Sequence, residues 1–313
     1  MLARLQQLMV ATSVVLALLW LAWCHEAGLG PFAMTAGVAL ALLPQAPVLG
    51  LEFVLLAAFG RDAAAPRAGA TALVRAWFGE VLASWRVFNW QQPFFAGRLP
   101  DAPVPPGPPE RSGVLLVHGY FCNRGVWLPW LRRLRHHGVP YRALTLEPAF
   151  GRIDDWVPAI EAAVAALTRQ TGRPPLVVAH SMGGLAVRAW LAAQPDAAAA
   201  DARVLRVLTI ASPHRGTWMA RFGHSLNARQ MRPGHRWLAQ LAAGESAARH
   251  ARFTCFFGHA DNIVFPATTA TLAGADNHHL PAVAHVAMVQ HPAVWDEACR
   301  WLQIDVARPD ARQ

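Results

Sequence analysis

Ser181 is the residue whose neighbours most clearly favour chemistry. It lies in the stretch 174–190, PPLVVAHSMGGLAVRAW, where the pattern of a buried strand changes at once to that of a helix. Ala179, Gly183 and Gly184 add little or no side-chain bulk around it. A sharp strand-to-helix corner needs such residues, because its backbone is strained and the helix packs tightly on the strand. We therefore predict that Ser181 is a nucleophile; the alternative is a serine that caps the helix.

A serine hydroxyl is a weak nucleophile at neutral pH, so it needs a base within hydrogen-bond reach and a carboxylate that orients the base. Asp261 lies just after a predicted strand, and His285 lies in the loop before the last predicted helix. The chain order Ser, Asp, His is the one expected for a serine at a strand-to-helix corner. Asp261 could instead be an ordinary turn carboxylate. The alternatives to His285 as the base are His278, His279 and His291.

Backbone N–H groups are the predicted donors to the negatively charged oxygen that forms during attack on a carbonyl. One is the N–H of Met182, at the start of the predicted helix. The other comes from the loop after the first strand of the domain, where Tyr120 follows a His-Gly pair. His180 directly precedes Ser181, and we expect its side chain to project away from the serine, so that it flanks the site without acting as the base.

Strand-like apolar runs alternate with helical patterns from residue 113 onward. This alternation predicts an α/β fold with a mostly parallel sheet covered by helices. In an open sheet of this kind the ligand site lies beyond the carboxyl ends of the strands. The expected strands are 113–119, 141–148, 175–181, 204–213 and one within 252–264; the expected helices are 126–138, 153–172, 182–194 and 292–304.

The first sixty residues are dominated by two apolar runs. Residues 8–24 carry no charge and have the length of a short membrane span. We interpret them as a retained anchor, because a signal peptide has a shorter apolar core and a small-residue cleavage site. The second run, 32–59, is interrupted by Pro44, Pro47 and Glu52, and could be one kinked span or a re-entrant pair of half-spans. We expect Glu52 to lie near an interface that water reaches, because an ionised glutamate is costly in lipid.

Arginines flank these runs at position 4 and at positions 61, 67 and 75. If both runs cross, the positive-inside rule places both flanks and the remainder of the chain on the cytoplasmic side. If only the first run crosses, the bulk of the protein faces outward. We expect the protein to lie in a membrane, the inner membrane of a bacterium, with the cytoplasmic side favoured for two spans.

The chain between the apolar runs and the sheet domain has two parts. Residues 70–95 predict a tryptophan-rich amphipathic helix, which either lies at a membrane interface or packs on the following domain. The proline-rich residues after it predict an extended linker. The predicted organisation is thus membrane-anchor helices at 1–62, a juxtamembrane helix at 63–97, a linker at 98–112, and the α/β domain at 113–313 with a helical cap at 213–252.

The composition narrows the classes of partner. Of the 313 residues, 54% are hydrophobic and only 15% are charged, against about 25% charged in a typical soluble protein, which indicates membrane contact. The net charge of +9 comes from scattered arginines without a single lysine, so we expect no nucleic acid partner. The four cysteines are widely separated, and neither a zinc site nor a disulfide framework is indicated. Nothing in the sequence indicates an oligomeric state.

Five segments in this order resemble the α/β-hydrolase superfamily, and within it the bacterial lipases and esterases related to triacylglycerol lipase: LVHGYFCNRGVW, VVAHSMGG, ASPHRGT, GHADNIVFP and AHVAMVQHP. The resemblance covers about residues 113–302. It implies cleavage of a carboxylic ester, such as a lipid, through an acyl group on Ser181, with no metal or organic cofactor. Ala179 stands where the commonest pattern has glycine, and a subset of bacterial lipases shares the Ala-His-Ser-Met-Gly form.

Three functions are compatible with the sequence. The leading one is a membrane-anchored serine hydrolase of lipid or acyl esters. The second is an acyltransferase or thioesterase of the same fold, because an acyl-serine can pass its acyl group to other acceptors. The third is a non-catalytic membrane scaffold with a hydrolase-like domain. Acyl-chain length and headgroup preference depend on the walls of the pocket, which the sequence does not indicate.

Overall fold

A six-stranded, entirely parallel sheet forms the centre of the protein, with strand order β2-β1-β3-β4-β5-β6. This parallel sheet confirms the predicted α/β class. The computed structural model describes residues 1–102 and 111–304. The strands are β1 (Val114–Val117), β2 (Tyr141–Ala143), β3 (Leu176–His180), β4 (Arg206–Ile210), β5 (Phe253–Phe257) and β6 (Asp276–His279).

Two of these strands differ from the sequence prediction. The expected strand at 141–148 is short, because only Tyr141–Ala143 pairs with β1. The sixth strand, β6, was not expected. Its sequence, DNHH, is polar and half-exposed, and it pairs with β5 at the edge of the sheet.

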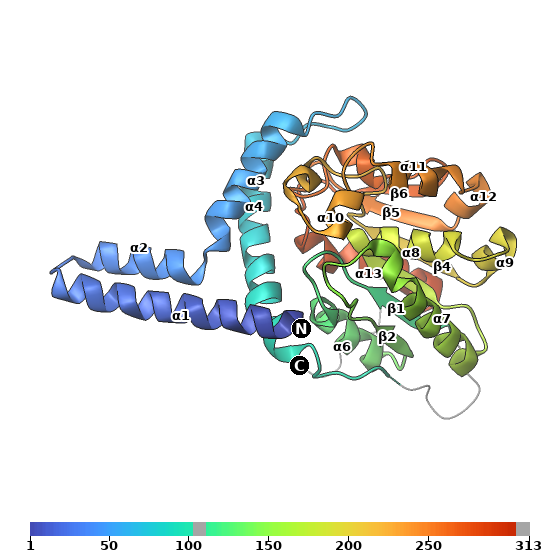
Figure 1. The fold of residues 1–313 in the computed structure, drawn as a ribbon, viewed down its shortest axis with the longest axis horizontal. Coiled ribbons are helices and arrows are strands. Elements are labelled where there is room, and N and C mark those ends of the chain that lie inside the picture. Colours follow the sequence, from blue (N-terminus) through green and yellow to red (C-terminus); the bar gives the residue numbers. More distant parts are fainter. Residues whose placement is uncertain (103–110, 305–313) are drawn as a thin grey trace.

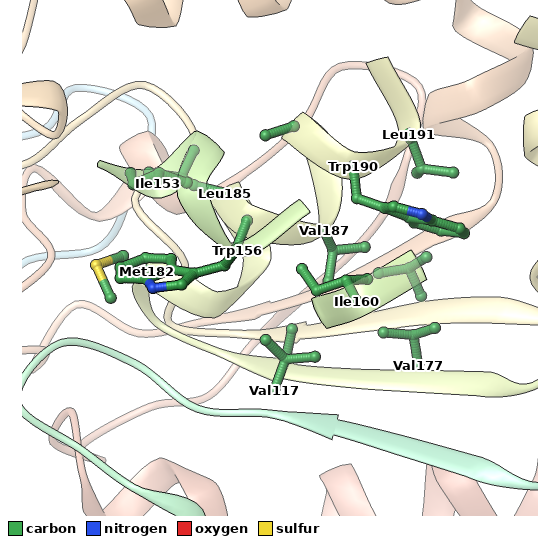
Figure 2. Close-up of a cluster of buried hydrophobic side chains, with 14 of the residues drawn as sticks. Val117, Ile153, Trp156, Ile160, Val177, Met182, Leu185, Val187, Trp190 and Leu191 are labelled. Atoms are coloured by element: carbon green, nitrogen blue, oxygen red, sulfur yellow. The ribbon is translucent and has the colours of Figure 1, made fainter. Parts of the chain in front are cut away.

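Helices cover both faces of the sheet, as predicted. The principal ones are α6 (Leu128–His136), α7 (Val157–Thr171), α8 (Met182–Ala192) and α13 (Pro292–Leu302). On one face, strand residues such as Leu115 and Val177 pack against α7 and α8. Figure 2 shows this layer, with Trp156 and Trp190 lying over the strands. On the other face, the alternate residues, including Leu116, pack against α6 and α13.

Short helices make up the segment predicted as a cap, and two buried ion pairs, Arg188–Glu245 and Arg249–Asp201, tie it to the sheet domain. The Arg188 side chain of α8 contacts Glu245 at 2.5 Å, and both side chains are essentially inaccessible. In addition, the backbone N–H of Ile153 donates a hydrogen bond to the side-chain oxygen of Gln230. The helices of this segment are η4 (Trp218–Phe222), α10 (Leu226–Gln230), α11 (Arg236–Ala243) and α12 (Ala247–His250).

Shorter elements connect the main layers. They are η2 (Arg124–Trp127), η3 (Ile153–Trp156), α9 (Ala197–Ala202), η5 (Ala267–Ala270) and η6 (Ala287–Gln290).

The N-terminal helices lie outside the sheet domain. In Figure 1, α1 and α2 lie side by side and project away from it, whereas α3 and α4 run next to each other along it. Trp20 of α1 donates a hydrogen bond to the backbone of Ala33 in α2. The elements are α1 (Leu2–Glu26), α2 (Pro31–Leu42), α3 (Gln45–Phe59), α4 (Ala70–Ser84), the π-helix η1 (Trp85–Gln91) and α5 (Gln92–Phe95).

Within the described residues, α1 is long and apolar enough to cross a membrane, a property that anchors and signal sequences share. Helices α2 and α3 meet the same criterion only together, and a bend of 71° separates them. This geometry agrees with the sequence expectation of a kinked or re-entrant second run.

The predicted helix at 70–95 packs on the sheet domain along one side. Val87 is buried with the residues of α6 and α13, and Ala76 is buried beside Ala260 and Ala284. Its opposite side carries exposed apolar side chains, among them Phe78 and Leu82. Most of the predicted linker, residues 103–110, lies outside the described residues, as does the end of the predicted α/β domain, 305–313. The domain boundaries therefore stay predictions.

Candidate active site

Ser181 occupies a one-residue corner between β3 and α8. Its backbone angles are φ 53° and ψ −129°, in a region where residues with side chains are strained. The glycines that follow have no room for a side chain. A Cβ added to Gly183 would lie 2.6 Å from the carbonyl oxygen of Val117, and one added to Gly184 would lie 2.3 Å from Ser212 Oγ. The corner therefore requires the small residues that the sequence places there.

Asp261 and His285 form a buried hydrogen-bonded pair. The distances from His285 Nδ1 to the two carboxylate oxygens are 3.0 and 3.1 Å, and the side chains are 7% and 1% exposed for His285 and Asp261. The backbone N–H groups of Ile263 and Val264 hold one of these carboxylate oxygens. Asp261 is thus fixed by its own turn and orients the imidazole of His285.

The other candidate histidines have different surroundings. His291 caps the N-terminus of α13. His278 and His279 are in β6, where His279 contacts His259 at 2.7 Å between ring nitrogens. Of the four histidines considered from the sequence, His285 is the one that contacts Asp261.

The pKa of His285 is raised above its usual value of 6.5. Burial alone would lower it, but the charge of Asp261 and the hydrogen bond to it outweigh burial, and the carboxylate of Glu80 adds to the effect. Burial holds the pKa of the neighbouring His180 well below 6.5. The ring of His180 lies against that of His285, with 4.7 Å between the centroids. It is a neutral neighbour of the expected base.

One predicted oxyanion donor, Met182, follows Ser181 in the chain, and the other, Tyr120, belongs to a loop that packs against the serine. Met182 begins α8, so its N–H is among those without a partner within the helix. The loop that contains Tyr120 packs closely against the serine. A Cβ added to Gly119 in this loop would lie only 2.8 Å from Ser181 Cβ. His118 fixes this loop: its Nε2 accepts a hydrogen bond from the N–H of Leu146, and burial lowers its pKa to about 4.

Two glutamates from the N-terminal helices reach the loop of His285. Glu80 of α4 is fully buried, and its carboxylate accepts hydrogen bonds from the N–H groups of Val286 and Ala287 at 2.8 and 3.0 Å. Burial raises the pKa of Glu80 to about 7, although these hydrogen bonds oppose the shift. The chain that carries the expected base is therefore held by a residue more than two hundred positions away.

Glu52 of α3 makes the second connection. It accepts a hydrogen bond of 2.6 Å from Asn262 Nδ2, and Asn262 Oδ1 accepts one from the N–H of His285. The carboxylate of Glu52 is thus hydrogen-bonded to the sheet domain, and the expectation that it lies near an interface that water reaches stays a prediction. The signal available in the sequence was the presence of single glutamates, Glu52 and Glu80, in otherwise apolar helices.

Among residues 1–102 and 111–304, no group of three or more His, Cys, Asp or Glu side chains is placed to hold a metal ion. The four cysteines, all within these ranges, are buried free thiols. The candidate groups at this site are the serine hydroxyl, the imidazole and the carboxylate described above.

Comparisons with known proteins agree with this architecture. Residues 114–308 match the model of the alpha/beta hydrolase family. No match was found among curated proteins. A lipase of Bacillus licheniformis in its mature form is similar in structure, with a TM-score of 0.54 and 15% identity, over 64% of this chain and 96% of the lipase. Lipase B of Aspergillus fumigatus is similar with the same TM-score and 19% identity, over 62% of this chain and 54% of that one. The chain belongs to the alpha/beta hydrolase family.

Proposed function

We propose that the protein is a membrane-anchored serine hydrolase that cleaves carboxylic esters, lipid or acyl esters above all, through an acyl group on Ser181. The observation that carries the proposal is the buried Asp261–His285 pair in a domain whose strained corner presents Ser181. Two structures with this fold are lipases, which favours an ester as the substrate.

His285 is the general base of the proposed reaction. Because Nδ1 is bonded to Asp261, Nε2 is left to accept the serine proton. Ser181 Oγ attacks the ester carbonyl carbon while its proton moves to His285. The intermediate then expels the alcohol, which takes that proton. A water molecule repeats the sequence on the acyl-serine and releases the carboxylic acid.

The negative charge on the carbonyl oxygen is stabilised by the N–H groups of Met182 and Tyr120. Donors that are already in position cost no reorganisation when the charge develops. The position of Met182 at the start of α8 adds the positive end of the helix dipole.

Membrane attachment is supported by the surface of the N-terminal helices. Apolar side chains on α1, such as Leu18 and Leu19, are 61% and 60% exposed, and on α4 Leu82 is 72% exposed. Soluble proteins rarely leave so much contiguous apolar surface in water. A bilayer would cover it.

The test is labelling with a fluorophosphonate probe, together with hydrolysis of p-nitrophenyl esters of graded chain length. We expect the wild-type protein to be labelled and to hydrolyse esters, and Ser181→Ala to lose both. Ser246→Ala, which changes a serine that caps α12, is the matched control and should keep both.

Equal labelling of the wild type and Ser181→Ala would disprove the assignment of the nucleophile. A wild-type protein that neither reacts with the probe nor hydrolyses any ester would disprove the proposed function.

A further inference from the structure

A cavity of about 450 Å³ lies between the N-terminal helices and the loop after β1. Ligand pockets in proteins have volumes of roughly 300 to 1,000 Å³, so this cavity is large enough for a small lipid. Its walls are mostly apolar and include Met9 and Val10 of α1, Val48 and Leu49 of α3, and Phe88 of η1. All of these residues precede the segment that matches the family.

The cavity adjoins the candidate active site at two points. Phe121, which lines it, directly follows the expected oxyanion donor Tyr120. Glu52 also lines the cavity and accepts a hydrogen bond from Asn262. Asn262 in turn accepts a hydrogen bond from the N–H of His285. A ligand in this cavity thus contacts the loop after β1 directly at Phe121, and it reaches the loops of Asp261 and His285 only through Glu52.

The cavity wall also contains a buried amide with an unused acceptor. Gln6 is 2% exposed, and its Nε2 donates to the carbonyl oxygen of Phe121 at 3.4 Å. Its Oε1 has no hydrogen-bond partner among the described residues. A buried polar atom without a partner costs free energy, so an occupant that donates a hydrogen bond to Gln6 is favoured over a purely apolar one.

The outer surfaces of the same helices face away from the protein. Next to the cavity-lining positions, Leu8 of α1 and Leu51 of α3 are 64% and 59% exposed. If these helices are inserted in a bilayer, the cavity lies between the lipid and the active site. This arrangement favours an occupant that arrives from the membrane.

We propose that this cavity binds the acyl chain of an ester between a long-chain fatty acid and a hydroxyl-bearing alcohol such as glycerol. The chain lies along Val10, Val48 and Leu49, and the ester end lies at Phe121, where a hydroxyl of the alcohol donates to Gln6 Oε1. The proposal rests on the proposed ester hydrolase function. It assigns chain-length selection to the N-terminal helices instead of the cap.

The first test is Val10→Phe, which adds volume inside the cavity. The matched control is Val15→Phe on the same helix, because Val15 is 52% exposed and does not line the cavity. For Val10→Phe we expect kcat/KM for p-nitrophenyl palmitate to fall about tenfold or more relative to that for p-nitrophenyl acetate, and for Val15→Phe we expect this ratio to stay the same. Equal losses for both esters, or no loss for either, would overturn the proposal.

The second test is Gln6→Met, which keeps the size of the side chain and removes both the acceptor Oε1 and the weak hydrogen bond from Nε2 to Phe121, so the effect is read as a ratio between two substrates. We expect kcat/KM for monopalmitoylglycerol to fall about threefold to tenfold relative to p-nitrophenyl palmitate, as the loss of one hydrogen bond predicts. An unchanged ratio between the two substrates would overturn the role of Gln6.

A binding measurement separates this inference from the proposed function. Dansyl-labelled undecanoic acid is titrated into Ser181→Ala in detergent, with Ser181→Ala/Val10→Phe and Ser181→Ala/Val15→Phe for comparison. We expect binding to be weakened only by Val10→Phe. Binding that is equal in all three variants would overturn the cavity assignment even in an active enzyme. Failure of the wild type to hydrolyse any ester, with this binding intact, would disprove the proposed function alone.

Discussion

Glu80 acts at two levels on the residue expected to be the base. Its carboxylate holds the two N–H groups after His285, and its charge contributes to the raised pKa of that imidazole. A base works in its neutral form, so activity rises as pH passes upward through the pKa of His285. We call the part of the profile of kcat/KM against pH over which activity rises its acid limb. The pH at which this limb lies depends on the charged groups around His285, namely Asp261, Glu80 and Glu52.

We predict that Glu80→Gln moves this limb to lower pH. Glu80, whose pKa is about 7, is partly ionised in the range where His285 titrates, and its negative charge favours the protonated imidazole. Its removal therefore lowers the pKa of His285 and leaves the base neutral at a more acidic pH. The measurement is kcat/KM for a short, soluble ester across the acid limb. Glu26→Gln, an exposed change at the end of α1, is the control and should leave the limb in place. A limb that stays in place or moves to higher pH in Glu80→Gln would contradict the prediction.

At the scale of elements, the ion pair between Arg188 and Glu245 fastens the segment 213–252 to α8. Removing one partner of a buried pair leaves the other charge in the interior without compensation. The guanidinium of Arg188 also donates to the carbonyl of His214, so it cannot turn toward solvent without a further loss.

We predict that Glu245→Ala lowers the free energy of unfolding by about 3 to 5 kcal/mol. The comparison is Asp276→Ala, which breaks a half-exposed pair with His278 and should cost about 0 to 1 kcal/mol. Thermal and urea unfolding in detergent measure both. Equal effects of the two substitutions would show that the buried pair does not hold this segment.

Much of the sheet domain could be predicted from the sequence, because local patterns carry that information. The apolar runs that became β1, β3, β4 and β5 have strand-like residues between turn signals, and the glycines after Ser181 mark the corner. Strand β6 carries no such pattern, since Asp276–His279 is polar and takes its conformation from pairing with β5.

The second layer of the candidate site could not be predicted in the same way. Glu80 and Val286 are joined by a hydrogen bond although they lie 206 positions apart in the chain. A pattern read from a short stretch of sequence cannot reveal such a contact. The cavity beside Phe121 also forms only when α1, α3 and η1 come together. The sequence indicated candidate reacting groups, but of what holds them it offered only single glutamates in otherwise apolar helices.

At the scale of the whole molecule, the base of α1 lies against the sheet domain. Gln6 and Gln7 donate hydrogen bonds to the backbone of Phe121 and Pro93. Helix α2 then returns beside α1. If α1 enters a bilayer and the bent pair of α2 and α3 returns through it, the start of α1 and the sheet domain are on the same side of the membrane, as expected for two spans.

We predict that cysteines introduced at Arg4 and at Arg173 react with a membrane-impermeant maleimide from the same side. Both positions are exposed, and the four native cysteines are buried, so the background is low. The experiment compares intact spheroplasts with inverted vesicles. The control is Arg173→Ala, which introduces no cysteine and so reports the background labelling of the four native ones. Labelling from opposite sides would contradict the two-span arrangement.

The hydrogen bonds that Glu80 accepts from Val286 and Ala287 predict how proteolysis between the N-terminal helices and the sheet domain would affect activity. A cut that freed the sheet domain from its N-terminal helices would leave Ser181 and Asp261 in the same chain, but it would strip the His285 loop of its acceptor. We expect a domain released in this way to lose ester hydrolysis, because the loop of the expected base is no longer held. Ester cleavage would then depend on attachment to the N-terminal helices.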